Sequence, residues 1–178
     1  MALIFSKWSL VINMKKFIPL LLALSFAAQA ADPIQLFFIQ RSKNKNEVRY
    51  ELLVNDDCSF KDKNPVHGYW QDLEKGPNVR SEIGTFEYIA YGIADQKIEG
   101  PWVQFKMKAI ENKNFKAQLV KKEKSCEALA YTDFKGQEGV LKKVYIFAVE
   151  GFVKPTVKYI ELFGVSSNGQ NLYEKMEF

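Results

Sequence analysis

Residues 47–55 read Glu-Val-Arg-Tyr-Glu-Leu-Leu-Val-Asn, and their apolar side chains recur at every second position. Val48 and Tyr50 begin the apolar set, whereas Glu47 and Arg49 begin the polar set. An alternation of period two is typical of a β-strand that buries one face and leaves the other in water. The pattern therefore predicts a half-buried strand over this stretch.

The residues before this stretch extend the prediction to a hairpin. Residues 34–41 form a strongly apolar run, which suits a strand that is buried on both faces. The link over residues 42–46 is short, polar and contains two asparagines, which favour turns. Two strands joined by such a link are predicted to pair as an antiparallel hairpin.

Similar strand patterns return along the rest of the chain. We predict further strands at residues 65–73, 103–109, 115–119, 128–134, 141–149, 156–164 and 172–178. The links between them are mostly short, and short links favour antiparallel neighbours, because a parallel return needs about a dozen residues or more. We therefore expect a mainly β domain, in which an antiparallel meander of about eight strands forms a barrel or a sandwich.

Residues 81–91 are the one good helix candidate. Apolar residues such as Ile83 and Phe86 recur there at helical spacing. Ser81 is placed to cap the N-terminus, and Gly92 is placed to end the helix in a left-handed conformation. We expect this short helix to cover one opening or one face of the β-structure.

The first 30 residues are predicted to be a secretory signal. Lys15 and Lys16 supply its positive region, residues 17–27 its apolar region, and Ala28-Gln29-Ala30 a cleavage site of small residues. The apolar run is too short to cross the hydrocarbon core, which is roughly 30 Å thick. An exported protein follows, most simply a periplasmic one, with secretion to the extracellular space as the other option.

Two alternatives concern this N-terminal segment. Apolar residues precede the lysine pair, so Met14 is a candidate for the true start. An uncleaved N-terminal anchor is the alternative to cleavage before Ala31. With cleavage, we expect no transmembrane span in the mature chain.

The charge balance argues against nucleic acid as a partner. The whole chain has 25 basic and 21 acidic residues. Lys7, Lys15 and Lys16 lie in the predicted signal, so the mature chain keeps 22 basic residues against 21 acidic ones. A nearly neutral domain has no general electrostatic attraction to nucleic acid or to anionic lipid.

Several segments of the chain resemble one bacterial family. They comprise residues 36–46, Pro65-Val66 with Tyr69-Trp70, Phe86-Glu87 with Ala90-Tyr91-Gly92, and residues 157–164 with Tyr173-Glu174-Lys175. In order and spacing they resemble the family called domain of unknown function 4833. The resemblance implies a single exported domain over residues 31–178, and it brings no activity, substrate or catalytic residue.

The two cysteines, Cys58 and Cys126, are predicted to form a disulfide. An exported chain meets an oxidising compartment, and an even set of two thiols can pair completely. The alternative is two separate thiols whose Cα atoms lie too far apart to be bridged.

Neither a metal site nor a catalytic centre is predicted. The chain has one histidine, His67, and lacks the four closely spaced nitrogen or sulfur ligands of a structural zinc site. His67 could act as a general base, but no nucleophile can be assigned to it. We expect no cofactor.

The polar segment after the first strand is a candidate binding site. Arg41 and Lys43 could hold an anionic group while Asn44 and Asn46 add directional hydrogen bonds. Two structural interpretations compete with this one. The asparagines could serve a hairpin turn, and Arg41 could pair with Glu87 inside the domain.

Aromatic residues offer a second set of candidates, because they could line a cavity or simply fill the core. The complete set of candidate binding residues is Arg41, Lys43, Asn44, Asn46, His67, Tyr69, Trp70, Glu87 and Tyr91.

The leading functional hypothesis is a non-catalytic periplasmic binding domain. It would take a small or amphipathic ligand in the interior or at the mouth of the β-structure. An envelope protein–protein interaction module is the alternative, and an enzyme of unknown class is a third, weaker one.

Overall fold

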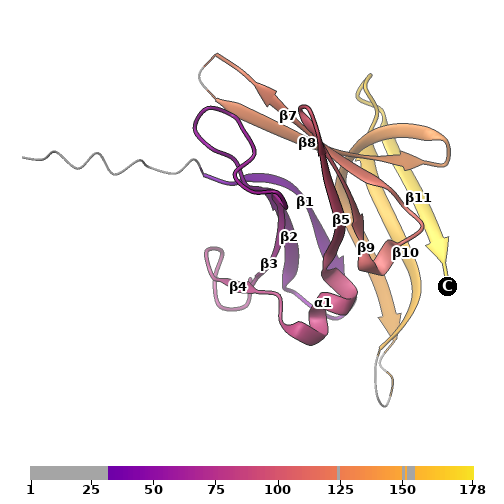
Figure 1. Ribbon diagram of the computed structural model, residues 1–178. Coiled ribbons are helices and arrows are strands. Elements are labelled where there is room, and N and C mark those ends of the chain that lie inside the picture. Colours follow the sequence, from indigo (N-terminus) through magenta and orange to yellow (C-terminus); the bar gives the residue numbers. More distant parts are fainter. Residues whose placement is uncertain (1–31, 124, 150, 152–154) are drawn as a thin grey trace, which may run out of the picture.

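The computed structural model describes residues 32–123, 125–149, 151 and 155–178. The predicted signal over residues 1–30, including Met14, lies outside the described residues. Within the described part, eleven strands form one sheet, and a seven-residue α-helix, α1, lies at one end of it (Figure 1). None of the described helices is both long and apolar enough to cross a membrane.

The strands and helices follow one another in this order: β1 (Ile34–Arg41), β2 (Glu47–Leu52), β3 (Val66–Gln71), β4 (Arg80–Glu82), α1 (Thr85–Tyr91), β5 (Ile93–Glu99), β6 (Trp102–Met107), the 3-10 helix η1 (Lys108–Ile110), β7 (Phe115–Lys121), β8 (Cys126–Phe134), β9 (Gln137–Val149), β10 (Thr156–Val165) and β11 (Asn171–Glu177).

The long strand β9 organises the sheet. One of its edges pairs antiparallel with β8 over residues 137–140 and parallel with β1 over residues 143–146, while its other edge pairs with β10. Two wings therefore diverge from β9: β1-β2-β3-β4 and β8-β7-β6-β5. In Figure 1, β1 to β3 lie to the left of β5 and β9.

The predicted mainly β class with one short helix is confirmed, but the closed barrel is wrong. The sheet is mixed because β1 and β9 run parallel, and β3 and β5 meet at a seam without a strand ladder. The Val66 N–H donates to Gln96 Oε1 at 2.8 Å, and Gln96 Nε2 donates to the Val66 carbonyl at 2.9 Å. One edge of β3 pairs with β2, and its other edge pairs with β4 over residues 69–71. Because that second edge is occupied, β5 does not pair with β3 and the sheet stays open.

Aromatic side chains fill the space between the wings. Phe37 stacks on Tyr50 with 4.6 Å between ring centroids, and Phe105 and Phe115 lie 5.7 Å apart beside them. All four are almost fully buried, and the Tyr50 hydroxyl donates to the Tyr91 carbonyl at 2.8 Å. The interior is thus a packed core, which leaves the ends of the structure as places for a ligand.

The helix differs from its prediction in two ways. It spans Thr85–Tyr91 with Gly84 as its N-cap, whereas Ser81 belongs to β4. Gly92 has φ −66°, so its backbone is extended and not left-handed. A glycine is needed there for lack of space, because a Cβ would lie 2.4 Å from the Tyr88 carbonyl oxygen. Phe86, one of the apolar residues at helical spacing, is 89 % exposed.

Candidate functional site

A cavity of about 620 Å³ lies beside α1, and we call it the α1 cavity. It lies among α1, the end of β1, η1 and the facing ends of β9 and β10. Its lining residues are Arg41, Phe86, Glu87, Ile89, Ala90, Tyr91, Ala109, Ile146, Ala148, Pro155, Val157 and Ile160. Nine of these twelve are apolar aliphatic, proline or phenylalanine residues, so the lining of the cavity is mainly apolar with a few polar groups.

The parallel pairing of β1 with β9 positions Arg41. The pairing ends at Arg41 opposite Ile146. Ser42 extends it by one step, since its backbone N–H donates to the Ile146 carbonyl at 2.9 Å. The buried Ser42 hydroxyl also donates to the Ala148 carbonyl at 3.0 Å and accepts from the Ala148 N–H at 3.1 Å. These bonds fix the backbone that carries the Arg41 side chain at the cavity.

Helix α1 supplies the other wall. Glu87 Oε2 accepts the Gly84 N–H at 2.9 Å, which completes the capping interaction at the start of the helix. Phe86 and Ile89 are 89 % and 69 % exposed and lie at the cavity rim. Exposed large apolar residues that gather beside a hollow are typical of a binding surface.

Tyr91 joins the cavity to the core. Its ring meets the Trp70 ring edge-on, with 5.3 Å between centroids and an angle of 76°. Burial raises the pKa of the Tyr91 hydroxyl, while the charge and hydrogen bond of Arg41 act to lower that pKa. Tyr91 is therefore a neutral phenol at physiological pH, and its hydroxyl is linked to the Arg41 guanidinium.

A second, shallower pocket of about 240 Å³ lies next to the first. Asn44, Asn46, Trp70 and Glu87 are among its lining residues, and Glu87 belongs to both hollows. The Asn44 side chain accepts the Asn46 N–H at 2.9 Å, and the Asn46 side chain accepts the Glu74 N–H at 3.3 Å. Asn44 thus bonds the local backbone, as the hairpin-turn interpretation of this segment expects, whereas Asn46 bonds the backbone of a distant turn.

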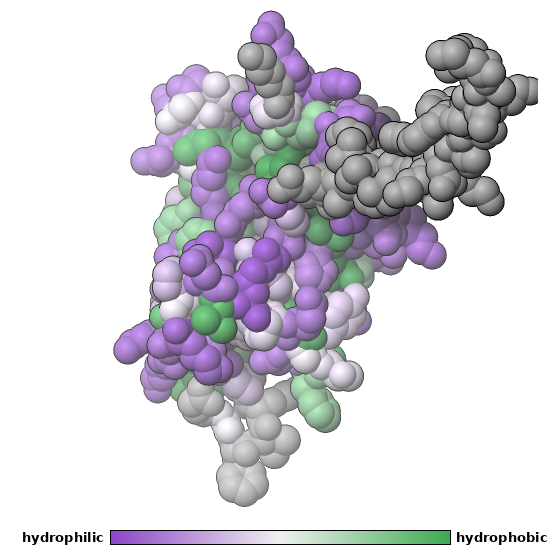
Figure 2. Space-filling model, turned by 90° about the vertical axis from the view of Figure 1, so that its left-hand side faces the viewer, coloured by the Kyte–Doolittle hydropathy of each residue, from purple (hydrophilic) through white to green (hydrophobic). Residues whose placement is uncertain are grey.

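Three further predicted binding residues line neither the α1 cavity nor the second pocket. Lys43 is exposed in the turn between β1 and β2, with φ 60°. His67 and Tyr69 lie on the outer face of β3, where the Arg80 guanidinium sits 3.6 Å from the centre of the Tyr69 ring. This face is mostly hydrophilic, with apolar residues scattered among polar ones (Figure 2).

The family model described as a domain of unknown function, DUF4833, matches residues 37–175. The chain belongs to the DUF4833 family. The resemblance seen in the sequence is thus confirmed, and the matched span includes every residue of the α1 cavity. No curated protein and no solved structure matches the chain.

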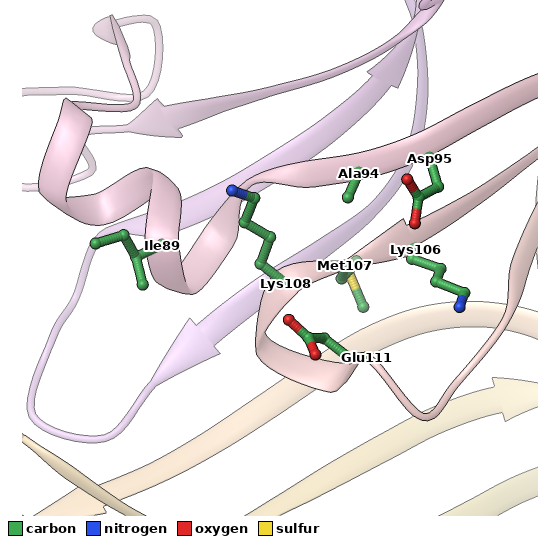
Figure 3. Close-up of a pocket in the computed structure, with 7 residues that line it drawn as sticks. All are labelled: Ile89, Ala94, Asp95, Lys106, Met107, Lys108 and Glu111. Carbon is green, nitrogen blue, oxygen red and sulfur yellow. The ribbon is translucent and has the colours of Figure 1, made fainter.

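The DUF4833 domain has a third hollow, of about 370 Å³, which shares Ile89 with the α1 cavity. Figure 3 shows Ile89 projecting from α1 on one side and Asp95 and Lys106 on the other, with Lys108 between them. The Lys108 ammonium lies 4.6 Å from the centre of the Tyr88 ring. Charges of both signs line this hollow. In the described part of the chain, no three His, Cys, Asp or Glu residues are grouped as metal ligands.

Most of the cavity wall was missed by sequence reasoning. Ala109, Ile146 and Ala148 are buried or half-buried and come from distant segments, so their alternation predicts only that they face inward. Phe86 and Ile89 could have been recognised from the sequence as cavity residues, since apolar residues on a short helix between turns need not be buried in the core. No local pattern showed which strand ends the helix would face.

Cys58 and Cys126 form a disulfide, with Cα atoms 5.5 Å apart. It ties the loop between β2 and β3 to the first residue of β8, and neither cysteine lines the α1 cavity. The disulfide therefore links two parts of the fold and is not part of the candidate site.

Proposed function

We propose that this DUF4833 domain is a non-catalytic binding domain that takes a small amphipathic ligand in the α1 cavity. The observation that carries the proposal is the apolar lining of a hollow of about 620 Å³. Pockets for small ligands are typically about 300–1,000 Å³ and are lined mainly by apolar side chains with a few placed polar groups. The α1 cavity has this composition.

Exposed apolar surface at the rim gives the ligand a source of binding free energy. Phe86 and Ile89 are largely in water. Full burial of one such side chain is worth roughly 1.5–3 kcal/mol. An apolar chain laid between them and the cavity wall would recover part of that amount.

The polar groups of the cavity suit binding better than catalysis. The Arg41 guanidinium offers hydrogen-bond donors and no acceptor, and burial holds the pKa of Tyr91 above its ordinary value. Glu87 is engaged at the helix cap. None of these three forms the nucleophile–base pair from which a hydrolytic centre is built.

We place this domain in the periplasm. The predicted signal peptide over residues 1–30 supports export. The disulfide between Cys58 and Cys126 is a weaker indication in the same direction, because disulfides persist in oxidising compartments.

The test is binding of N-phenyl-1-naphthylamine, a neutral apolar fluorophore, to the purified mature protein. Ala90→Trp fills the cavity from the exposed side of α1, and Phe86→Ser removes the rim. We expect each to weaken binding at least fivefold. The matched control is Phe178→Ser, because Phe178 is 63 % exposed and does not line the cavity. Equal affinity in all four proteins would refute the proposal.

A second candidate function is docking of an envelope protein on the same rim, and the 89 % exposure of Phe86 favours it. A photo-crosslinking residue at position 86 in exporting cells separates the two functions. Adducts of protein size support docking, whereas a bound mass of a few hundred daltons in native mass spectrometry supports a small ligand.

A further inference from the structure

We propose that the outward face of β1, β9, β10 and β11 binds an extended, uncharged glycan strand of β-1,4-linked sugars. We call this surface the aromatic face, and its rings are those of Phe38, Tyr145, Phe147, Tyr159, Phe163 and Tyr173. None of the six lines the α1 cavity. The proposal therefore concerns a second site and does not depend on the proposed function.

Strand parity creates the aromatic face. Along β9, Val144 and Ile146 are buried in the core, so the alternating side chains of Tyr145 and Phe147 point outward. The ladders with β1 and β10 bring the outward residues of these strands side by side. Tyr173 is 47 % exposed, and the other five rings are partly exposed. Exposed apolar surface gathered on one side of a sheet is typical of an interaction site.

The register arranges three of the rings in a row across the strands. Lys143 on β9 lies between Phe38 on β1 and Phe163 on β10. Phe163 lies opposite Tyr173 on β11, with 5.5 Å between ring centroids. Neighbouring strands are about 4.8 Å apart, so the row of four residues is about 14 Å long. One strand spacing is similar to the length of one sugar unit in an extended chain, so this row can follow several units.

The rings suit the flat faces of sugars. The face of an aromatic ring is electrostatically negative, so it attracts the polarised C–H groups on the flat side of a pyranose ring. Phe147 and Tyr159 stack at an interplanar angle of only 11°. Rings that lie against one another make a low, flat surface, whereas a single protruding ring would suit a pocket in a partner. Because β-1,4 linkages keep a chain of glucose units extended and α-1,4 linkages curve it, the flat surface favours the β-linked chain.

A polar row runs beside the aromatic one. The same register places four polar side chains opposite one another on the four strands: Gln40, Tyr145, Glu161 and Lys175. Successive outward positions on a strand are about 7 Å apart, so this row borders a chain that is stacked on the first. Its amide, phenol, carboxylate and ammonium groups supply donors and acceptors for the hydroxyl groups at the edge of a sugar.

The charges on the aromatic face favour an uncharged ligand. The ladder-paired outward positions carry two lysines, Lys143 and Lys175, and two glutamates, Glu161 and Glu177. The Tyr173 hydroxyl donates to Glu161 at 2.7 Å, and Lys175 pairs with Glu177 at 2.8 Å. Lys143 Nζ lies 5.7–5.9 Å from the centres of three rings. This balance gives the face no net charge with which to attract a polyanion or an anionic membrane.

The experiment titrates the isotope-labelled mature protein with cellohexaose, a β-1,4-linked glucose hexamer, and with maltohexaose, its α-1,4-linked isomer, and follows the backbone amides by NMR. We expect cellohexaose to shift the amides of β9, β10 and β11 and to bind at least tenfold more tightly than maltohexaose. Equal affinity for the two hexamers would overturn the proposal, and so would shifts confined to α1 and the strand ends beside it.

Variants assign the binding to the aromatic face. Tyr173→Ala removes its most exposed ring and should weaken cellohexaose at least fivefold, whereas Tyr173→Phe keeps the ring and should stay within twofold of wild type. The matched control is Tyr88→Ala, which should leave the affinity unchanged, because Tyr88 is 45 % exposed and has a bonded hydroxyl but lies on α1. Unchanged affinity in folded Tyr173→Ala would overturn the proposal and assign the rings to stabilisation of the sheet.

Two other occupants would show themselves in the same variants. Flotation with phosphatidylglycerol vesicles that Tyr173→Ala abolishes, without cellohexaose binding, would overturn the proposal in favour of a membrane surface. A dimer in sedimentation equilibrium that Tyr173→Ala dissociates, again without cellohexaose binding, would overturn it in favour of a second copy of the chain. Fluorophore binding in the α1 cavity is measured separately, so failure of cellohexaose leaves the proposed function standing.

Discussion

Glu51 carries a carboxylate into a nearly buried position on the outer face of β2, with only 5 % of the residue exposed. Arg80 donates to its Oε1 at 2.6 Å, and His67 Nδ1 lies 3.4 Å from the same oxygen. His67 Nε2 lies 3.1 Å from Glu82 Oε2. One buried acid is therefore matched by two cations, and the histidine bridges three neighbouring strands.

The pKa directions in this cluster define a pH window. Burial acts to raise the pKa of Glu51, but the hydrogen bonds of His67 and Arg80 outweigh it and leave that pKa below 4.5. The hydrogen bond to Glu51 is the main cause that raises the pKa of His67 above 6.5, against burial. The Glu51 contribution is lost as pH falls through its folded value, and the His67 contribution is lost as pH rises through its folded value. Both are fully present between about pH 4.5 and 6.5.

His67→Gln is predicted to destabilise the protein by about 0.5–1 kcal/mol at pH 6 and by almost nothing at pH 9, because His67 is partly exposed and only its charged form binds both acids. Urea unfolding at the two pH values measures the difference. Lys97→Gln, which removes an exposed ion pair with Glu99, should change stability little at either pH. A loss of equal size at pH 6 and pH 9 would show that charge is not involved.

Whether a candidate site residue on β3 faces inward or outward follows from strand parity, which is the alternation of side chains between the two faces of a strand. His67 and Tyr69 share one face of β3, and Trp70 lies on the other face, next to Tyr91. The sequence contained this parity, so it could have separated the outer pair from Trp70. It could not show that Arg41 meets Tyr91, because that contact depends on where a short helix packs against the end of β1.

At the scale of elements, the seam between β3 and β5 is held by a side chain where a ladder is missing. Gln96→Ala is predicted to leave the Val66 N–H and carbonyl without partners, at a cost of about 1–3 kcal/mol. Hydrogen exchange should show lost protection at the Val66 amide, and urea unfolding gives the free energy. The control is Gln104→Ala, whose side chain bonds exposed Glu99. Unchanged protection at Val66 would mean that other contacts hold the seam.

The elements that the sequence predicts well are strands with a strong apolar run or a clear alternation. The apolar run at residues 34–41 gives β1, whose bounds agree with the prediction. Strands β4 and β5 were missed. β4 has only three residues, all exposed, and β5 is interrupted between Ala94 and Lys97, where Asp95 has φ 52°. The parallel pairing of β1 with β9 was missed because the two strands lie about a hundred residues apart, and short links between neighbours carry no information about it.

At the scale of the whole molecule, the disulfide and the packed core hold together two wings that the strand ladder leaves open along one side. The bond joins residues 68 positions apart, so its removal frees a large loop in the unfolded chain. In the chain-entropy model a loop of this length is worth about 4 kcal/mol. A marginally stable domain has only about 5–15 kcal/mol in total. Removal of the bond should therefore cost a substantial part of the stability.

The double variant Cys58→Ser/Cys126→Ser is predicted to unfold at a markedly lower urea concentration than the oxidised protein, by an amount equivalent to about 4 kcal/mol. Wild-type protein reduced during unfolding should match the variant, which separates loss of the bond from the serine substitutions. Because neither cysteine lines the α1 cavity, the folded variant should bind N-phenyl-1-naphthylamine with wild-type affinity. Weaker binding at temperatures where the variant is folded would mean that the bond also sets the spacing of the wings, and with it the shape of the cavity at their end.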